Sequence, residues 1–563
     1  MGTGVNAEVA GVLERIADLL LVIGENPFKV RAYQRAAEAV RRSPHAVATM
    51  TRNELIKLDG IGKGTSEAIF AIAETGTCTE LESLMAKVPH NLPELLELDG
   101  VGPKTVQKLW NHLNITSLAD LEIAARERRI RALRGFGEKK EEDILRAVRV
   151  YKNRSGRMLV SDAEEIAREV ASTLVPGTYS YAGSLRRGRS TVGDIDIVTI
   201  QPAQKVNTKI REIASEMIDE GLKKTSFFYR GKRIDIRFAD PGEFGATLMY
   251  LTGSKEFNIR LRERAIARGM QLNEYGLLNK QNGEMTRCAT EDQIFSLLGL
   301  HFIPPELRED RGEVAAAEAG TLPVLIEQSD IRGDLHAHTT GSDGLLTIDE
   351  LASTGDVLGY EFILCSDHSA SLGVARGLTP EGLKTQAHEI EITNRNHDCQ
   401  ILAGIEVDIM TDGSLGLPDA VLADLDIVIA SVHSQLNQES DHITRRVLTA
   451  IENEHVDIIG HPTGRLIGRR EPSAIDIPRI LETAKERGVA VELNASPHRL
   501  DLDDIYLKTA HELGVKIAIG TDSHGPGDFA AMRYGVTTAR RGWCGAHDIL
   551  NTYSLPGLLD YFR

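Results

Sequence analysis

The stretch YSYAGSLRRGRSTVGDIDIVTI, residues 179–200, decides the fold of the region around it. Its pattern predicts a strand, a tight turn at Gly183-Ser184, a short arginine-rich helical turn and a second strand. Residues two apart on a strand point to the same side, so Asp194 and Asp196 are expected to share one face of a sheet. Two crowded carboxylates repel each other unless a cation joins them, and their oxygens suit a hard ion such as Mg²⁺. The stretch therefore predicts a divalent metal site.

The turn before the second strand has the residues that a metal-bound phosphate requires. Gly183 lets the backbone approach closely, Ser184 offers a hydroxyl, and amides at the start of the helical turn favour anions. Arg187 and the arginine before it add forked donors that match phosphate oxygens. An isolated Asp-x-Asp on a solvent-facing strand usually has no function. Gly-Ser followed nine residues later by Gly-Asp-x-Asp, which starts at Gly193, is instead the signature of the nucleotidyltransferase superfamily.

The string GSLRRGRSTVGDID, residues 183–196, resembles the palm of family X DNA polymerases, the group that includes DNA polymerase beta. The resemblance continues in KRIDIR, residues 232–237, where polar and apolar residues alternate. A charged outer strand would explain that string by itself, but the family carries the same residues after the same interval. The resemblance therefore implies a catalytic, metal-binding triad of Asp194, Asp196 and Asp235.

By the same resemblance, the triad holds two Mg²⁺ or Mn²⁺ ions, one of which activates the primer 3′-hydroxyl while the other stabilises the leaving pyrophosphate. Positioning and charge neutralisation carry this chemistry, without a covalent intermediate. The nucleotide itself is expected to contact Gly183, Ser184, Arg187 and Gly193.

The string YLTGS, which begins at Tyr250, matches the thumb of the family. The resemblance places Tyr250 near the sugar of the incoming nucleotide and lets the backbone approach the nucleotide at Gly253. It places Asn258 on the base edge in the minor groove and Arg262 on the templating side. The family often has Phe at the position of Leu251, which leaves the discrimination between deoxyribose and ribose open.

The first 150 residues contain three copies of the pattern L-x-G-h-G, where h is apolar, and each copy precedes a predicted helix. Two glycines around an apolar residue make a turn whose amides point outward at the start of the next helix, as phosphate binding requires. Plain turns between helices are the alternative, but three copies with lysines beside them favour contact with the DNA backbone. The copies resemble helix-hairpin-helix motifs. The DNA-binding residues predicted on this basis are Gly60, Gly62, Lys63, Gly100, Gly102, Lys104, Gly135 and Gly137.

The region of the first hairpin also resembles the lyase domain of DNA polymerase beta, with Lys29 and Tyr33 at matching positions. Ala68 stands where that domain has the lysine that forms a Schiff base, and Gly64 stands where it has a second lysine. No imine forms without an amine nucleophile. The sequence thus predicts no efficient 5′-deoxyribose-phosphate lyase activity.

The formal net charge of −17 is unusual for a DNA-binding protein, but the acidic excess lies after residue 300. The first 300 residues are nearly neutral with local basic clusters, so nucleic acid is not excluded as a partner. The five cysteines show no C-x-x-C spacing, which fits a reducing cytoplasm. The apolar run at residues 19–23 is too short to span a membrane. We expect a cytoplasmic monomer that reaches the nucleoid through DNA.

The second half of the chain follows a stretch at 311–330 that is rich in Ala, Glu and Gly and reads as a linker. Seven short apolar runs then alternate with helical stretches, which predicts a parallel sheet or barrel with its active site at the C-terminal ends of the strands. A lone histidine at a strand end would be structural, but most of the 17 histidines lie in this half, and with carboxylates they suit Mn²⁺, Zn²⁺ or Fe²⁺. The candidate ligands are His336, His338, Asp343, His368, Glu406, His433, His461, Asp522 and His524.

This set resembles the complete trinuclear metal site of the polymerase-and-histidinol-phosphatase (PHP) domain. The resemblance implies a metal-dependent phosphoesterase with up to three Mn²⁺ or Zn²⁺ ions. Arg376, Arg465 and Arg499 are candidates for holding the substrate phosphate, although a solvated surface explains each of them equally well.

The whole chain resembles bacterial and archaeal family X DNA polymerases that carry a C-terminal PHP domain. The resemblance implies a polymerase that uses dNTPs on gapped or primer-template DNA in base excision repair, with 3′→5′ exonuclease, abasic-site endonuclease or 3′-phosphatase activity in the barrel. Two alternatives stay open: an active polymerase with a structural barrel, and a nuclease or phosphatase tethered to DNA with an inactive palm. The expected domains are an all-α DNA-binding domain (1–85), helix-hairpin-helix fingers (86–152), an α+β nucleotidyltransferase palm (153–240), a thumb (241–310), the linker (311–330) and a distorted TIM-like (β/α)7 PHP barrel (331–563).

Overall fold

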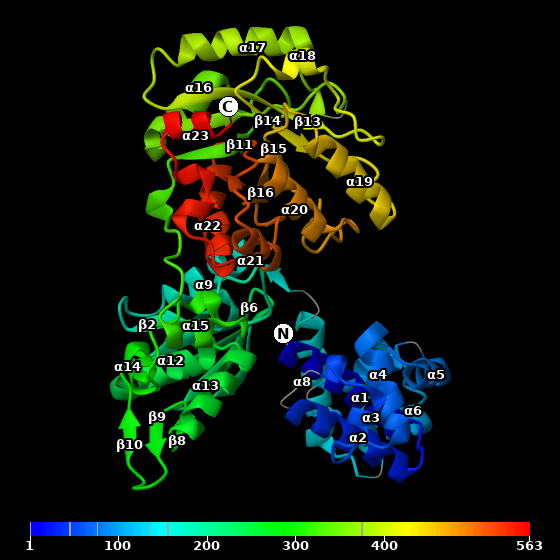
Figure 1. Ribbon diagram of the computed structural model, residues 1–563. Coiled ribbons are helices and arrows are strands. Elements are labelled where there is room, and N and C mark those ends of the chain that lie inside the picture. The colour runs from blue at the N-terminus through cyan, green and yellow to red at the C-terminus, as the bar shows by residue number, and fades with distance from the viewer. Residues whose placement is uncertain are drawn as a thin grey trace. The chain divides into compact units, whose positions relative to one another are not determined.

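The computed structural model of the chain describes residues 2–43, 47–75, 77–89, 91–98, 100–133, 135–154, 157–372 and 375–562. The chain forms two compact units, residues 1–156 and 157–563, which are both drawn in Figure 1. Among the helices of the described ranges, none has both the length and the apolar composition needed to cross a membrane.

The described residues of the first unit form helices joined by turns. The helices are α1 (Gly2–Val22), α2 (Pro27–Arg42), η1 (Val47–Thr49), α3 (Arg52–Leu55), α4 (Lys63–Thr75), α5 (Thr79–Lys87), η2 (Leu92–Glu97), α6 (Pro103–Leu113), α7 (Leu118–Arg126), η3 (Ile130–Ala132) and α8 (Glu138–Arg154). They bury their apolar faces in one shared core, in which Leu13 and Leu20 have no exposed surface. The side chain of Asn26 accepts a hydrogen bond from the amide of Phe28, and Pro27 supplies the fixed φ that suits the first position of α2.

The second unit begins with the palm, a five-stranded sheet in the order β2-β4-β7-β6-β5. Its elements are β1 (Met158–Leu159), α9 (Val160–Ala171), β2 (Tyr179–Tyr181), α10 (Gly183–Arg186), β3 (Thr191–Val192), β4 (Ile195–Thr199), α11 (Ala203–Ile213), β5 (Glu216–Glu220), β6 (Lys224–Tyr229) and β7 (Lys232–Phe238). Ile195, Ile197, Ile234 and Ile236 of the central strands are fully buried in a core shared with α9 and α11. Because side chains alternate along a strand, the opposite face of these strands carries the polar residues.

The thumb follows the palm and extends into the stretch that composition suggested as a linker. Its elements are η4 (Pro241–Glu243), α12 (Phe244–Thr252), α13 (Lys255–Ala267), β8 (Met270–Asn273), β9 (Gly276–Asn279), β10 (Met285–Arg287), α14 (Glu291–Leu297), η5 (Pro305–Leu307) and α15 (Glu313–Ala319). Helix α15 lies within 311–330, and its Ala317 is buried in the same core as Phe257 and Phe295. Alanine and glutamate are strong helix formers, so the string EVAAAEA forms a packed helix here and not a flexible connection.

The rest of the second unit is a parallel seven-stranded sheet whose strands β11 to β17 follow one another in chain order. Its elements are η6 (Gln328–Asp330), β11 (Gly333–Ala337), α16 (Ile348–Leu358), β12 (Phe362–Cys365), α17 (Pro380–Thr393), β13 (Gln400–Asp408), α18 (Asp419–Leu422), β14 (Ile427–Ser431), α19 (Ser440–Ile451), β15 (Ile458–Ile459), α20 (Ile477–Arg487), β16 (Ala490–Asn494), α21 (Asp504–Leu513), β17 (Ile517–Gly520), η8 (Asp528–Ala531), α22 (Met532–Arg541), η9 (Ala546–Asp548), η10 (Leu550–Thr552) and α23 (Leu555–Tyr561). A parallel bridge between Ala337 and Ser523 brings the first strand beside the last, so the sheet nearly closes into a barrel with helices around it (Figure 1). The predicted parallel barrel is confirmed.

Candidate active sites

The three carboxylates of the palm converge because two neighbouring strands carry them in register. Strands β4 and β7 are parallel, and Asp196 lies directly opposite Asp235. Asp194 immediately precedes β4, which begins one residue later than the sequence pattern suggested. Ile195 and Ile234 beside them are fully buried, so the carboxylates face away from the core.

The charges of these carboxylates are only partly balanced by the protein. Burial, together with repulsion from Asp194 and Asp235, raises the pKa of Asp196 to about 7. Asp235 is paired, with Oδ2 at 2.9 Å from Nζ of Lys224 and Oδ1 at 3.3 Å from Nε of Arg233. Burial would raise the pKa of Asp235, but a serine hydroxyl and these two cations outweigh it and lower the pKa. A crowded set of oxygen donors of this kind fits Mg²⁺ or Mn²⁺.

The turn at Gly183 lies directly against the central carboxylate. Gly183 has a φ of 59°, and a Cβ at this residue would lie 2.4 Å from Oδ2 of Asp196, so the close approach requires glycine. At the other end of the same turn, Nε of Arg187 donates to Oε1 of Glu309 at 3.0 Å, and Nη1 donates to the carbonyl of Thr252. The turn therefore connects the carboxylates to the thumb.

Two further residues predicted to contact the nucleotide border this turn. Ser184 is the second residue of α10 and is half-buried. Gly193 directly precedes Asp194, and a Cβ at Gly193 would lie 3.4 Å from a guanidinium nitrogen of Arg157. Ser184 thus follows the glycine that contacts Asp196, and Gly193 adjoins Asp194.

The predicted thumb contacts lie close to the palm turn. A Cβ at Gly253 would lie 3.2 Å from Nη1 of Arg187, which places these two residues in contact. Nδ2 of Asn258 donates to the carbonyl of Tyr250 at 2.7 Å, and Nε of Arg262 donates to the carbonyl of Asn258 at 3.2 Å. Tyr250 and Arg262 also line a cavity of about 560 Å³. Tyr250 and Arg262 thus share one open cavity of the thumb, and Gly253 contacts the arginine of the palm turn.

The three hairpins of the first unit share one geometry. In each of them the first glycine has a positive φ, and the second glycine is exposed immediately before α4, α6 or α8. Lys63 and Lys104 are exposed in the first turns of α4 and α6. These positions leave the turns accessible to a DNA backbone. The glycine pairs are Gly60 and Gly62, Gly100 and Gly102, and Gly135 and Gly137.

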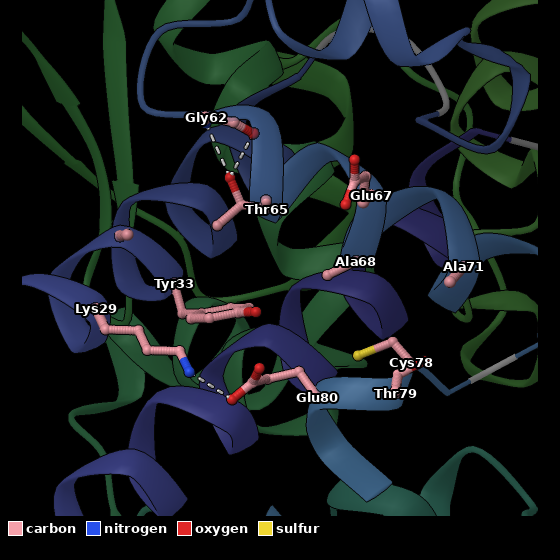
Figure 2. A pocket seen from close by; sticks show the side chains of 12 residues that line it. Lys29, Tyr33, Gly62, Thr65, Glu67, Ala68, Ala71, Cys78, Thr79 and Glu80 are labelled. Carbon is pink, nitrogen blue, oxygen red and sulfur yellow. Dashed lines mark hydrogen bonds and ion pairs between the residues drawn. The ribbon is translucent and has the colours of Figure 1, made fainter. Parts of the chain in front are cut away.

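A pocket of about 490 Å³ in the first unit occupies the place where a lyase site was considered, and Figure 2 shows it from close by. Nζ of Lys29 lies 2.8 Å from Oε1 of Glu80. Burial and the carboxylate of Glu80 raise the pKa of Tyr33 to about 12. Ala68 and Gly64 line this pocket, and Lys29 is the one lysine among its described lining residues.

The nine predicted barrel ligands gather around the C-terminal ends of the strands. Nε2 of His461 lies 2.9 Å from Oε1 of Glu406 and so joins the others. The remaining ligands form three overlapping groups, each with donor atoms within 4.8 Å of one another: His338, Asp343, His368 and His524; His336, His338 and Asp522; and His368, Glu406 and His433. Three groups that share members fit a cluster of up to three ions.

Buried opposite charges dominate this cluster. Burial would raise the pKa of Glu406, but His433 and His336 hold it well below its usual value. Burial would lower the pKa of His336, but the carboxylates of Glu492, Glu406 and Asp522 raise it well above its usual value. The site therefore favours positive charge, and a donor set of imidazoles and carboxylates suits Mn²⁺ or Zn²⁺.

Two carboxylates that the sequence analysis missed hold the ligand rings in place. Oε1 of Glu492 lies 2.7 Å from Nδ1 of His336, and Oδ1 of Asp408 lies 2.8 Å from Nδ1 of His433. Contacts of this kind fix the orientation and the tautomer of a metal-binding histidine. Glu492 lies inside an apolar strand, and Asp408 follows Glu406 by two residues, so a search for acidic residues along whole strands would have found both.

The three arginines considered for substrate phosphate differ in their surroundings. Nε of Arg499 lies 3.4 Å from Oδ2 of Asp522, which places it beside the barrel ligands. Arg465 donates to the carbonyls of Arg499 and Leu500 and so supports the backbone there. Arg376 is exposed and has a positive φ. Of the three, Arg499 is therefore the best placed to contact a phosphate.

Both units of the chain are similar to known proteins. Family models match as a helix-hairpin-helix domain at residues 5–78, a SAM-like helix-hairpin-helix tandem at 92–149, a DNA polymerase beta thumb at 247–309 and a PHP domain at 334–496. The chain is 41% identical to DNA polymerase/3′-5′ exonuclease PolX of Bacillus subtilis (strain 168), over 99% of each chain. It is 27% identical to DNA polymerase lambda of Rattus norvegicus, over 54% of this chain and 57% of that protein. It is also 38% identical to a probable phosphatase of Thermoanaerobacter sp. (strain X514), over 34% of this chain and 78% of that protein.

The fold and the two sites define a class of enzyme in which a nucleotidyltransferase palm and thumb are followed by a metal-dependent PHP barrel. The similarity over nearly the full length of both chains narrows this class. The chain belongs to the PolX family, the family X DNA polymerases that carry a C-terminal PHP domain.

Proposed function

We propose that the protein extends primers across short gaps in DNA at the palm and removes 3′-terminal nucleotides at the barrel. One observation supports polymerase activity at the palm most directly. The strand register sets Asp196 opposite Asp235, and the turn at Gly183 lies beside them. The converging histidines and carboxylates of the barrel support the hydrolysis of phosphodiesters. Together the two activities suit a repair enzyme that trims and fills gaps.

In the palm, the three aspartates would hold two Mg²⁺ or Mn²⁺ ions, which supply charge neutralisation at the primer hydroxyl and at the leaving pyrophosphate. Ser184 and Arg187 bind the outer phosphates of the dNTP and orient it for in-line attack. The residues of the thumb border the sugar and base. These thumb residues are Tyr250, Gly253, Asn258 and Arg262.

In the barrel, the nine ligands would hold up to three Mn²⁺ or Zn²⁺ ions, which supply Lewis-acid activation of a phosphodiester. Glu492 and Asp408 hold His336 and His433 so that Nε2 of each ring faces the cluster. Arg499 balances negative charge on the phosphate of the substrate.

The DNA partner is gapped or primer-template DNA, which the hairpins hold by its backbone and without regard to base sequence. The small-molecule substrates of the palm are dNTPs. We expect a monomer that acts on nucleoid DNA in the cytoplasm.

A DNA substrate with a one-nucleotide gap and a labelled primer distinguishes the activity of the palm from that of the barrel. With Mg²⁺ or Mn²⁺, the wild-type chain is expected to extend the primer when dNTPs are present and to shorten it when they are absent. Asp194→Ala with Asp196→Ala should abolish extension and retain shortening, whereas His336→Ala with His338→Ala should do the opposite. Extension by the first variant or shortening by the second contradicts the assignment of the sites.

A second activity of the barrel is favoured by the similarity to a probable phosphatase. A primer that ends in a 3′-phosphate tests it, because release of inorganic phosphate precedes any shortening of the strand. An abasic site in the same duplex tests for endonuclease cleavage. Neither product should form in the variant that lacks the imidazoles of His336 and His338.

A further inference from the structure

Arg541 is the last residue of α22, a helix of the barrel drawn in red in Figure 1, yet its side chain contacts the palm. The residue is 3% exposed. Nη1 of Arg541 donates to the carbonyl oxygen of Arg187 at 2.6 Å and to Oε1 of Glu309 at 3.0 Å, while Nη2 donates to Oδ2 of Asp504 at 2.7 Å. One guanidinium group thus joins the barrel, the thumb and the phosphate-binding turn of the palm.

Glu309 connects Arg541 to the guanidinium group of Arg187. Oε1 of Glu309 lies 3.0 Å from Nε of Arg187 and 3.0 Å from Nη1 of Arg541, and Oε2 lies 3.4 Å from Nη1 of Arg189. Burial alone would raise the pKa of Glu309, but the three guanidinium groups hold it below its usual value. The carboxylate is therefore ionised at neutral pH and fixes the direction of the Arg187 side chain.

The backbone of the turn also packs directly against α22. Gly188 has a φ of 67°, and a Cβ at this residue would lie 2.2 Å from Cγ2 of Thr537. Ala531, just before α22, and Tyr534, in its first turn, are buried in the core of the palm. The barrel therefore packs directly against the turn that carries Arg187.

Support of this kind affects nucleotide binding, because a phosphate-binding arginine that is ordered in advance loses less conformational entropy on binding. Arg187 is held at two places. Glu309 and the carbonyl of Thr252 hold its guanidinium group, and Arg541 holds its backbone carbonyl. The contact to the backbone is supplied by the barrel.

We propose that Arg541 is a positioning residue for the polymerase site, through which the nuclease barrel supports the binding of dNTPs. The proposal rests on the proposed role of Arg187 in holding the outer phosphates. A lysine at position 541 would keep the charge of Arg541 but would lack the planar fork that reaches Arg187, Glu309 and Asp504 together. Loss of the fork should therefore weaken dNTP binding while leaving hydrolysis in the barrel intact.

The test compares Arg541→Met with Arg540→Met. Arg540 also joins the barrel to the thumb, with Nε at 2.7 Å from Oε1 of Glu306, and so provides a matched control on the same helix. Gap filling at saturating gapped DNA gives KM for the dNTP and kcat, and primer shortening without dNTP reports on the barrel. We expect Arg541→Met to raise KM about tenfold with kcat changed less than about threefold, and Arg540→Met to change KM less than about twofold. Arg541→Lys should give an intermediate KM, and primer shortening should match the wild type in all three variants.

A KM for Arg541→Met within about twofold of wild type overturns the proposal. An equal rise in Arg540→Met overturns it too, because that result indicates a general loosening of the barrel. If the methionine variant does not fold, the KM of Arg541→Lys decides. In a chain that already carries Arg187→Lys, Arg541→Met should add no further rise, since the effect acts through Arg187. A wild-type chain that fails to extend primers refutes the polymerase itself, whereas extension with an unchanged KM in the variant refutes only the positioning role.

Discussion

Asp457, just before β15, shows how burial makes one carboxylate sensitive to pH. Its Oδ2 accepts the amide hydrogen of Val428 at 2.7 Å, and burial raises the pKa of Asp457 well above that of an ordinary aspartate, to about 7. A carboxyl group whose pKa is higher in the folded state contributes stability that is complete below the unfolded pKa and is lost as the pH rises through the folded pKa. The ionised form of Asp457 therefore destabilises the barrel above neutral pH.

Asp457→Asn keeps an oxygen acceptor for Val428 but removes the ionisation. We compare the free energy of unfolding of the variant with that of the wild type at two pH values. As the pH rises from about 5 to about 8, the difference should shift in favour of the variant by about 1–3 kcal/mol. Midpoints of thermal or denaturant unfolding at the two pH values measure this. Asp426→Asn is the control, because Asp426 accepts the amide hydrogen of Ala403 in the same way from an exposed position. An equal gain in both variants would show that burial is not the cause.

Ala68 and Gly64 determine the behaviour of the pocket in Figure 2 toward a 5′-deoxyribose phosphate. Since neither supplies an amine, borohydride should trap no covalent adduct between the wild-type chain and nicked DNA that carries this sugar. Ala68→Lys introduces an amine beside Tyr33 and should give a detectable adduct. An adduct with the wild-type chain would refute the prediction, and its loss in Lys29→Ala would identify Lys29 as the nucleophile.

Glu492 and Asp408 are expected to act on the proposed barrel ions through the histidines that they contact. Glu492→Gln and Asp408→Asn should each weaken metal binding by about 10-fold to 100-fold and lower exonuclease activity, because the ligand rings lose their fixed tautomer. Titration of the metal-free chain with Mn²⁺ measures the affinity. Glu482→Gln, at an exposed position on α20, is the control and should leave both quantities unchanged. Wild-type affinity in the first two variants would assign these carboxylates a structural role only.

At the scale of elements, the sequence was sufficient where one repeating pattern decides the structure. Apolar runs that end in ligand-type residues predicted strands β11 to β17, because the strand ends of a parallel sheet meet at one edge. The pattern failed where tertiary packing decides. Helix α15 is ordered by contact with the thumb core, and Glu492 was missed because it lies inside a strand. The contacts of Arg541 with Arg187 and Glu309 join residues more than 200 positions apart and leave no local trace.

The helices α4 and α6 carry a prediction about salt. Lys63→Ala and Lys104→Ala should each weaken DNA binding to a similar degree for all sequences and reduce the slope of log K against log salt by about one. The reason is that each exposed lysine contacts phosphate and releases a counterion. Fluorescence anisotropy measures the binding of gapped DNA at several salt concentrations and so gives the slope. Lys384→Ala, on the exposed face of α17, is the control and should leave the slope unchanged. Equal slopes for all three variants would contradict the role of the hairpins in DNA binding.

At the scale of the molecule, the palm, thumb and barrel belong to one compact unit. Leu500, Ala531 and Tyr534 of the barrel are buried in the core of the palm, and Trp543 is buried in the core of the thumb. Removing the barrel would expose apolar surface on both. The barrel therefore contributes to the stability of the palm and thumb by packing against them.

Two variants test whether the polymerase depends on the barrel. One is a chain truncated after residue 330, and the other is the full-length chain with His336→Ala and His338→Ala. Both should lack exonuclease activity, but only the shortened chain loses the packing of Tyr534 and the contact of Arg541. We expect the shortened chain to fill a one-nucleotide gap with kcat/KM at least about tenfold below that of the full-length variant, or to fail to fold, while the full-length variant stays within about threefold of wild type. Gap filling and thermal unfolding of both chains measure the difference. Equal gap filling would mean that the palm and thumb are stable without the barrel, because the surfaces that it covers could then face water at little cost.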